Sequence, residues 1–128
     1  MKRINTYIIE KLNKINSKSK VIEQDPYNPN TWLVGDILSG TAGYSMQLPR
    51  FYKIIKRLPH SFQVIRIKGK IISGNRNGQW EEVPNEPHEE LGKVLTCRIP
   101  NKEGRSVKVD GISVHLWDGN PLYGDDMD

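Results

Sequence analysis

The sequence has few cysteines and no long apolar runs. Its 128 residues contain one cysteine, Cys97, and no CxxC pair, so an internal disulfide and a cysteine-based zinc site are excluded. No apolar run approaches the roughly 18–20 residues of a membrane-spanning helix. Met1-Lys2-Arg3 is not followed by the apolar segment of a signal peptide. We therefore expect a cytoplasmic protein of a reducing compartment with no membrane partner.

Standard catalytic and nucleotide-binding motifs are also missing. The chain contains no HExxH, GxSxG, GxGxxG or GxxxxGK[ST]. Its histidines, His60, His88 and His115, are far apart in the sequence, so acid–base cleavage of RNA would require His60 and His115 to meet in the fold. We therefore expect a non-catalytic protein without cofactor or metal. A histidine-dependent RNase is the less favoured alternative.

Acidic residues are absent from the middle of the chain. No Asp or Glu lies between Asp36 and Glu81, and the first 76 residues carry 14 Lys/Arg against 4 Asp/Glu. Such a segment produces a positive field if it folds onto one face, which favours phosphate-bearing partners. The alternative is that these cations solvate outer strand faces and pair with the acidic second half. The central cations are Arg50, Lys53, Lys56, Arg57, Arg66, Lys68, Lys70 and Arg76.

The acidic residues of the second half form two clusters. One is predicted to lie in a loop over residues 81–90, broken by Pro84 and Pro87, and the other in the tail over residues 124–128. We interpret them as a solvated loop and a frayed terminus. Phosphate mimicry or binding of a divalent cation is the alternative interpretation. The clustered residues are Glu81, Glu82, Glu86, Glu89, Glu90, Asp125, Asp126 and Asp128.

The hydrophobic pattern predicts a mainly β protein. Apolar residues at helical spacing predict one short helix over residues 4–15, within an N-terminal appendage of residues 1–30. From Trp32 onward, alternating segments and Gly-rich turns predict about five or six short strands. Residues 51–58 fit a helix or a strand, and the turn at residues 59–61 favours the strand. The predicted domain, residues 31–123, is a small, partly open SH3-like or OB-like barrel.

Aromatic residues are interleaved with the central cations, as in barrels that bind single strands. Phosphate contacts are predicted for six cations and base stacking for two tyrosines, whereas Phe51 and Phe62 are expected in the core. The predicted binding residues are Arg50, Lys53, Lys56, Arg57, Arg66, Lys68, Tyr44 and Tyr52.

Several short motifs resemble a family of small proteins encoded by bacteriophages and other bacterial mobile elements. The matching segments are residues 35–38 (GDIL), 43–46 (GYSM), 51–56 (FYKIIK), 61–67 (SFQVIRI) and 116–123 (LWDGNPLY). The chain departs from the family pattern in three places. Ala42 stands where Trp is usual, residues 48–50 (LPR) stand where Asp or Asn is common, and Asn120 replaces Lys.

The resemblance implies a small β domain that acts in the cytoplasm of an infected bacterial host, with no known activity or cofactor. Together with the charge pattern, it leads to the hypothesis of an accessory protein that binds nucleic acid or a host nucleoprotein. An anti-defence inhibitor is one form of that function. A sponge for a small signalling nucleotide is the alternative hypothesis.

Overall fold

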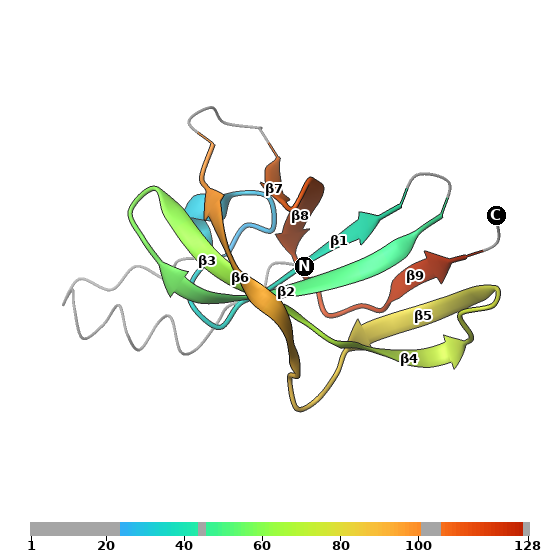
Figure 1. Cartoon of the computed structure of the whole chain (residues 1–128). Helices are drawn as coiled ribbons and strands as arrows, with labels where there is room; N and C mark the ends of the chain where they lie inside the picture. Colours follow the sequence, from blue (N-terminus) through green and yellow to red (C-terminus); the bar gives the residue numbers. More distant parts are fainter. Residues whose placement is uncertain (1–23, 44–45, 101–105, 127–128) are drawn as a thin grey trace.

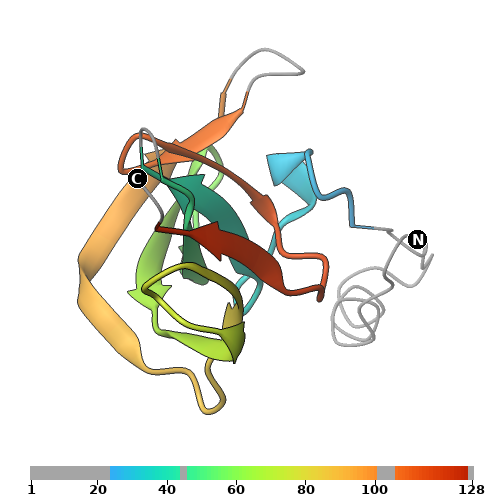
Figure 2. The ribbon, with the colours of Figure 1, turned by 90° about the vertical axis from the view of Figure 1, so that its right-hand side faces the viewer.

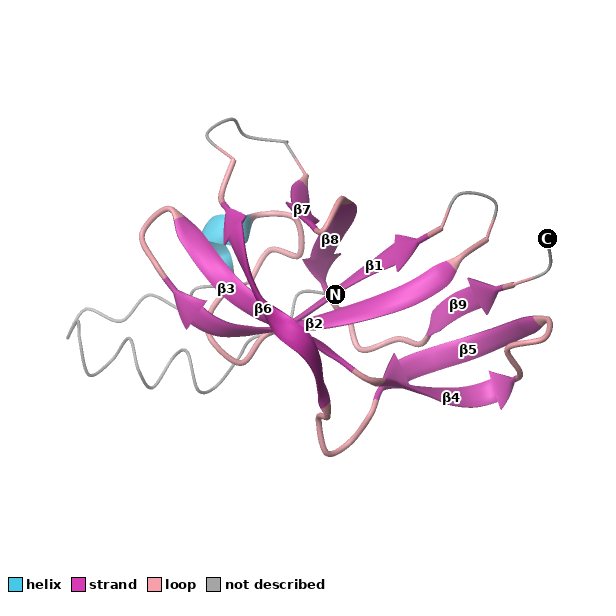
Figure 3. Ribbon diagram, viewed as in Figure 1, coloured by secondary structure: helices cyan, strands magenta, loops and turns pink. Residues whose placement is uncertain are grey.

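The computed structural model describes residues 24–43, 46–100 and 106–126. Strands and loops dominate this part of the chain, and its one helical element is the 3-10 turn η1 (Pro29–Thr31) (Figure 3). The prediction of a mainly β fold is therefore confirmed. The helix predicted over residues 4–15 lies outside the described residues.

The larger sheet is strongly curled and forms a half-barrel (Figure 1). Its strands are antiparallel in the order β6-β3-β2-β1-β8-β7, and the two end strands, β6 and β7, come into contact. Figure 2 shows β6 curving round one side of the sheet. The strands are β1 (Ile37–Ala42), β2 (Leu48–Arg57), β3 (Ser61–Ile67), β6 (Glu90–Arg98), β7 (Val107–Val109) and β8 (Ile112–Leu116).

A second, three-stranded sheet lies beside the half-barrel. It consists of β4 (Gly69–Gly74), β5 (Gln79–Pro84) and β9 (Leu122–Asp125), in the order β4-β5-β9. β4 follows β3 after a single residue, and an isolated bridge between Gln47 and Asp125 connects β9 to the start of β2. The chain therefore passes from one sheet to the other within the β3–β4 connection.

Residues 51–58 are confirmed as strand for the most part, because β2 runs through Arg57 and the hairpin to β3 follows it. The prediction of a loop over residues 81–90 is wrong at both ends of that range. Glu81 and Glu82 belong to β5, and Glu90 begins β6. The Glu82 side chain is buried, and its carboxylate accepts hydrogen bonds from the Trp80 indole at 2.9 Å and from Arg76 at 3.4 Å, which offset the cost of burial.

The core fills one end of the half-barrel. Alternation along β2 and β3 turns Ile54, Phe62 and Val64 to the concave face, where all three are fully buried. Trp32 closes this end, and its indole donates to the Asp25 carbonyl at 3.0 Å. Phe51 is also buried, but on the opposite face, where its ring meets the edge of Trp117 at 6.1 Å. Burial of both phenylalanines was expected.

The residues just before β1 pack against the half-barrel. Gln24 is buried, and its side-chain amide donates to Asp36 at 2.6 Å. The Leu116 backbone donates to the carbonyl of Pro26 at 3.0 Å, and the neighbouring Tyr27 ring stacks on His115 at 5.2 Å. The segment 24–31 therefore covers the outer side of β8.

Candidate functional site

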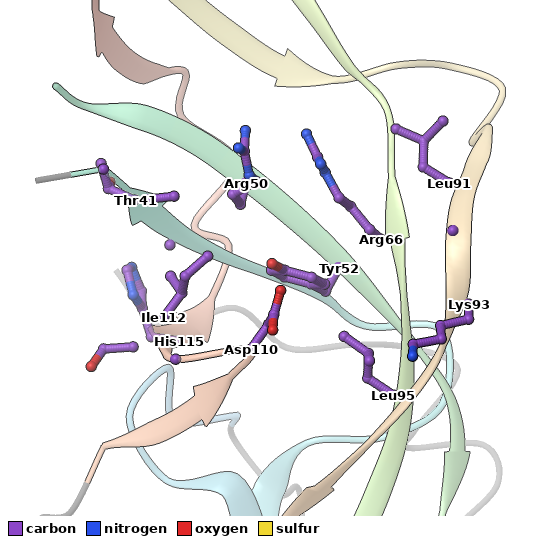
Figure 4. A pocket seen from close by; sticks show the side chains of 16 residues that line it. Thr41, Arg50, Tyr52, Arg66, Leu91, Lys93, Leu95, Asp110, Ile112 and His115 are labelled. Atoms are coloured by element: carbon purple, nitrogen blue, oxygen red, sulfur yellow. The ribbon is translucent and has the colours of Figure 1, made fainter.

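The other end of the half-barrel is open and holds a cavity of about 940 Å³ (Figure 4). This end is open because the concave face of β1 carries a large residue, Leu38, at one end and two small residues, Gly40 and Ala42, towards the other. Leu38 packs in the core, whereas the two small residues leave space in front of the neighbouring strand. The cavity is therefore the part of the half-barrel interior that core side chains do not fill.

Two arginines enter the cavity from adjacent strands. Tyr52 pairs with Arg66 across β2 and β3, and Arg50 lies two residues before Tyr52, so all three side chains share the concave face. Figure 4 shows Arg50 and Arg66 side by side above the Tyr52 ring. Burial lowers the pKa of Arg50, and the positive charge of Arg66 lowers it further. The arrangement concentrates positive charge that an anion would neutralise.

Neither arginine has a carboxylate partner within the part of the chain that the structure describes. The ion pairs there are Lys68–Glu89, Arg76–Glu82 and His88–Glu86. Arg50 donates one long hydrogen bond, at 3.4 Å, to the carbonyl of Pro49. Both guanidinium groups therefore keep donors that can bind an oxyanion, and a planar guanidinium fits phosphate in a bidentate manner.

Tyr52 forms the floor of the cavity. Its side chain is 3% exposed, which leaves almost no ring surface for a nucleic-acid base. Burial raises the pKa of its phenol, while the nearby Arg66 and Arg50 act in the opposite direction. The stacking role expected for Tyr52 does not fit this position, and Tyr44 lies outside the described residues.

Apolar side chains and a single carboxylate also line the cavity. Leu91 and Leu95 of β6 and Ile112 of β8 line it. Asp110, in the turn between β7 and β8, has a backbone φ of 52° and lies on the other side of Tyr52 from the arginines (Figure 4). Lys93 adds a third cation from β6. The cavity therefore combines three cations with apolar side chains and one carboxylate, and Lys93 lies between Leu91 and Leu95 on β6.

The remaining predicted cations lie elsewhere. Lys53 and Lys56 have the opposite orientation on β2 and lie on the convex face. Arg57 lies at the closed end, where it donates to the carbonyl oxygens of Trp32, Leu58 and Ser61. Lys68 pairs with Glu89 at 3.6 Å. Of the six predicted phosphate contacts, the fold brings only Arg50 and Arg66 together.

The two histidines of the RNase alternative do not meet. His115 of β8 pairs with Ser39, which pairs with Phe51, whereas His60 lies in the turn beyond the end of β2. The six steps along β2 from Phe51 to Arg57 separate them by roughly 20 Å at about 3.3 Å per residue. The geometry gives no support to a His60–His115 pair.

Sequence reasoning missed the residues that complete the cavity, namely Leu91, Lys93, Leu95, Asp110 and Ile112. The Asp110-Gly111 pair carries a turn signal, which the structure confirms. No local pattern indicates that this turn faces Arg66 across the barrel, because that placement depends on how tightly the sheet curls.

Two further features concern the described part of the chain. It contains no group of three or more His, Cys, Asp or Glu side chains placed to hold a metal ion. Within the same residues, no helix has the length and apolar character needed to cross a membrane.

Comparisons of the chain with protein-family models, with curated proteins and with solved structures find no match.

Proposed function

We propose that this protein is a non-catalytic binding protein that takes phosphate groups of nucleic acid into the open end of its half-barrel. One observation carries the proposal. Arg50 and Arg66 lie side by side in a cavity, and no ion pair among the described residues involves either of them. Two close guanidinium groups outside any such ion pair repel each other, and the Glu82 carboxylate offsets this at Arg50 only in part, so an oxyanion between them would be stabilised.

A small signalling nucleotide is the second candidate ligand. The cavity volume, about 940 Å³, falls within the roughly 300–1,000 Å³ typical of small-molecule sites. Lys53 and Lys56 lie on the convex face, so the cations do not form the continuous groove that would follow a long strand. A sponge for a small nucleotide would need this concave site and no catalytic residue.

The biological setting that we propose is that of a phage or mobile-element accessory protein acting on a nucleic acid or nucleoprotein of the host. This setting rests on the resemblance of the short motifs, and one of them forms a hydrogen-bonded turn here. Within residues 116–123, the Trp117 indole donates to the Asn120 carbonyl at 2.7 Å, and Asp118 accepts from the Asn120 backbone at 2.9 Å.

The proposal predicts that Arg66→Gln weakens binding of a labelled single-stranded oligonucleotide by about 10- to 100-fold, the usual range for losing a charged hydrogen bond. Fluorescence anisotropy at fixed salt measures the change. Lys53→Gln, which removes the same charge on the convex face of β2, is the matched control and is expected to change affinity less than threefold. Equal effects of the two substitutions contradict the proposal.

Capture of partners from a bacterial lysate, with and without nuclease, shows whether the ligand is a nucleic acid or a protein. Loss of all partners on nuclease treatment supports nucleic-acid binding. Retention of one protein after treatment, insensitive to Arg66→Gln, contradicts it and indicates a protein inhibitor that uses another surface.

A further inference from the structure

The cavity differs on its two sides, and a bare phosphate would use only one of them. Arg50 and Arg66 lie on one side of Tyr52, and the Asp110 carboxylate lies on the other (Figure 4). Burial and the Asp110 carboxylate raise the pKa of the Tyr52 phenol, whereas the charges of Arg66 and Arg50 act in the opposite direction. A carboxylate repels phosphate, so a ligand that fills this cavity needs a hydrogen-bond donor at the Asp110 end.

Asp110 is available for such a donor. Its residue is exposed, and no ion pair among the described residues involves it. It lies at the tip of the two-residue turn that joins β7 and β8, with Gly111 in the same left-handed conformation. Residues of this turn are held by strand pairing on both sides, so the carboxylate is presented from a defined position.

Apolar side chains from β6 and β8 line the cavity beside these charged groups, with Lys93 between the two leucines of β6. Leu91 lies directly opposite Arg66 in the β3–β6 pairing, and Leu95 lies opposite Val64, so both belong to the concave face. Ile112 lines the cavity from β8. Aliphatic side chains of this kind contact the flat face of a nucleobase without selecting its identity, whereas a carboxylate selects for amino groups.

We propose that the cavity takes one complete nucleotide unit, with its phosphate on Arg50 and Arg66, its base against the leucine wall, and an amino group of the base donating to Asp110. The inference rests on the proposed function and narrows it. It names the recognised group as a nucleotide whose base carries an exocyclic amino group. The unit is either a free nucleotide or the terminal nucleotide of a strand.

Isothermal titration calorimetry with matched ligands tests the inference. CMP and AMP carry an exocyclic amino group, whereas UMP and IMP have the same size and carry a carbonyl in its place. We expect CMP to bind about tenfold more tightly than UMP, or AMP about tenfold more tightly than IMP, depending on which base size fits. Ribose 5-phosphate and inorganic phosphate are expected to bind more weakly than either member of the pair.

Asp110→Asn tests the role of the carboxylate. The amide has the same size, tolerates the left-handed backbone of the turn, and both donates and accepts hydrogen bonds. It is expected to reduce the tenfold preference to less than threefold while Arg66-dependent binding of phosphate remains. Glu81→Gln, which neutralises an exposed carboxylate on β5, is the control and is expected to keep the preference.

A short single-stranded oligonucleotide with a 3′-terminal C or U separates the two sources of the nucleotide unit. Preference for terminal C, abolished by Asp110→Asn, supports capture of a strand end, and a preference seen with CMP alone supports a free nucleotide. Binding of ribose 5-phosphate as tight as that of CMP and AMP overturns the inference and leaves the proposed function in place. Absence of any Arg66-dependent binding, by nucleotides or oligonucleotides, overturns both.

Discussion

Arg57 and Arg50 lie on the same strand and the same concave face, but the fold gives them different roles. The Arg57 guanidinium is held at the closed end by the carbonyl oxygens of Trp32 and Ser61, each at 3.3 Å, and by that of Leu58. The Arg50 guanidinium makes one long bond and faces the cavity. Burial lowers the pKa of both groups, so the difference between them is the number of carbonyl partners and not their charge.

Cys97 shows how burial removes reactivity from a residue. Its side chain is 4% exposed in the core, and desolvation raises the pKa of its thiol from 9.0 to about 11. Because the thiolate is the nucleophile, the folded protein contains almost no reactive form of Cys97 at neutral pH. The residue therefore acts as a small apolar core side chain.

The raised pKa predicts a pH dependence of stability. The neutral thiol is favoured in the folded protein, so the contribution of Cys97 is complete below pH 9 and is lost as the pH rises from about 9 towards 11. Over that window the unfolding free energy is expected to fall by up to about 3 kcal/mol more than in Cys97→Ala. Urea unfolding at several pH values measures the difference, in which titration of the lysines and tyrosines cancels. Parallel pH profiles would show that the thiol is not desolvated.

At the scale of the elements, β5 is a strand whose charged residues make it difficult to predict from the sequence. Two adjacent glutamates suggest a loop, yet alternation buries Trp80 and Glu82 and exposes Glu81. The buried carboxylate is satisfied by the Trp80 indole and Arg76. Gly69 lies so close to it that a Cβ there would overlap the Glu82 carboxylate. The buried charge is tolerated because Trp80 of the same strand and Arg76 of the β4–β5 turn donate hydrogen bonds and Gly69 of β4 leaves room for the carboxylate.

The pairing of β1 with β8 depends on a similar close approach at Gly40. A Cβ at this position would lie 2.5 Å from the Ser113 carbonyl oxygen and 2.8 Å from the Ile112 Cγ2 atom. The nearest obstacle is backbone, which cannot move aside without disturbing the β1–β8 ladder. Glycine therefore allows β8 to follow the curl of the sheet and to bring Asp110 over the cavity.

Gly40→Ala is expected to lower the unfolding free energy by about 1–3 kcal/mol, the usual cost of overpacking a close contact. Thr41→Ala, at the next and exposed position of the same strand, is the control and is expected to change stability by less than about 0.5 kcal/mol. Chemical denaturation of the two variants beside the parent chain gives the comparison. A Gly40→Ala protein as stable as the parent would mean that β8 lies farther from β1 than described.

On the scale of the whole molecule, the curl of the six-stranded sheet decides which charges act together. A flat sheet would place Arg50, Arg66 and Lys93 on a broad open face. The curl brings β6 and β7 into contact and encloses the three cations with the Asp110 turn. Lys53 and Lys56, on the convex face, do not line the cavity.

Because the cavity arginines and the convex lysines lie on opposite faces of the sheet, we expect oligonucleotide binding to depend only weakly on salt concentration. If two phosphate contacts form, the slope of log affinity against log salt is about −1.4 for a single strand, whereas six contacts would give about −4. Anisotropy titrations between 50 and 300 mM salt distinguish these values. A slope near −4, reduced by Lys53→Gln, would mean that the convex face carries the strand.

The folded architecture was accessible from local patterns to a large extent. The β-branched residues of 62–67, the alternation in residues 112–116, the Asp110-Gly111 turn and the hairpin at residues 59–61 predict strands that the structure contains. These signals are local because strand pleating and turn conformation depend on neighbouring residues. The β5 strand was missed because two adjacent glutamates suggest a loop, whereas burial of Glu82 depends on hydrogen bonds from Trp80 and Arg76 and on the space left by Gly69 of β4.

Composition and alternation alone establish a mainly β, partly open barrel with a cation-rich middle and no disulfide. Which cations share a cavity is a tertiary property. Strand register sets Arg66 opposite Tyr52 and turns Lys53 away, and the curl of the sheet, made possible by Gly40, brings Asp110 across from both arginines. Register and curl arise from contacts between residues distant in the sequence, so the site appears only when the chain is folded.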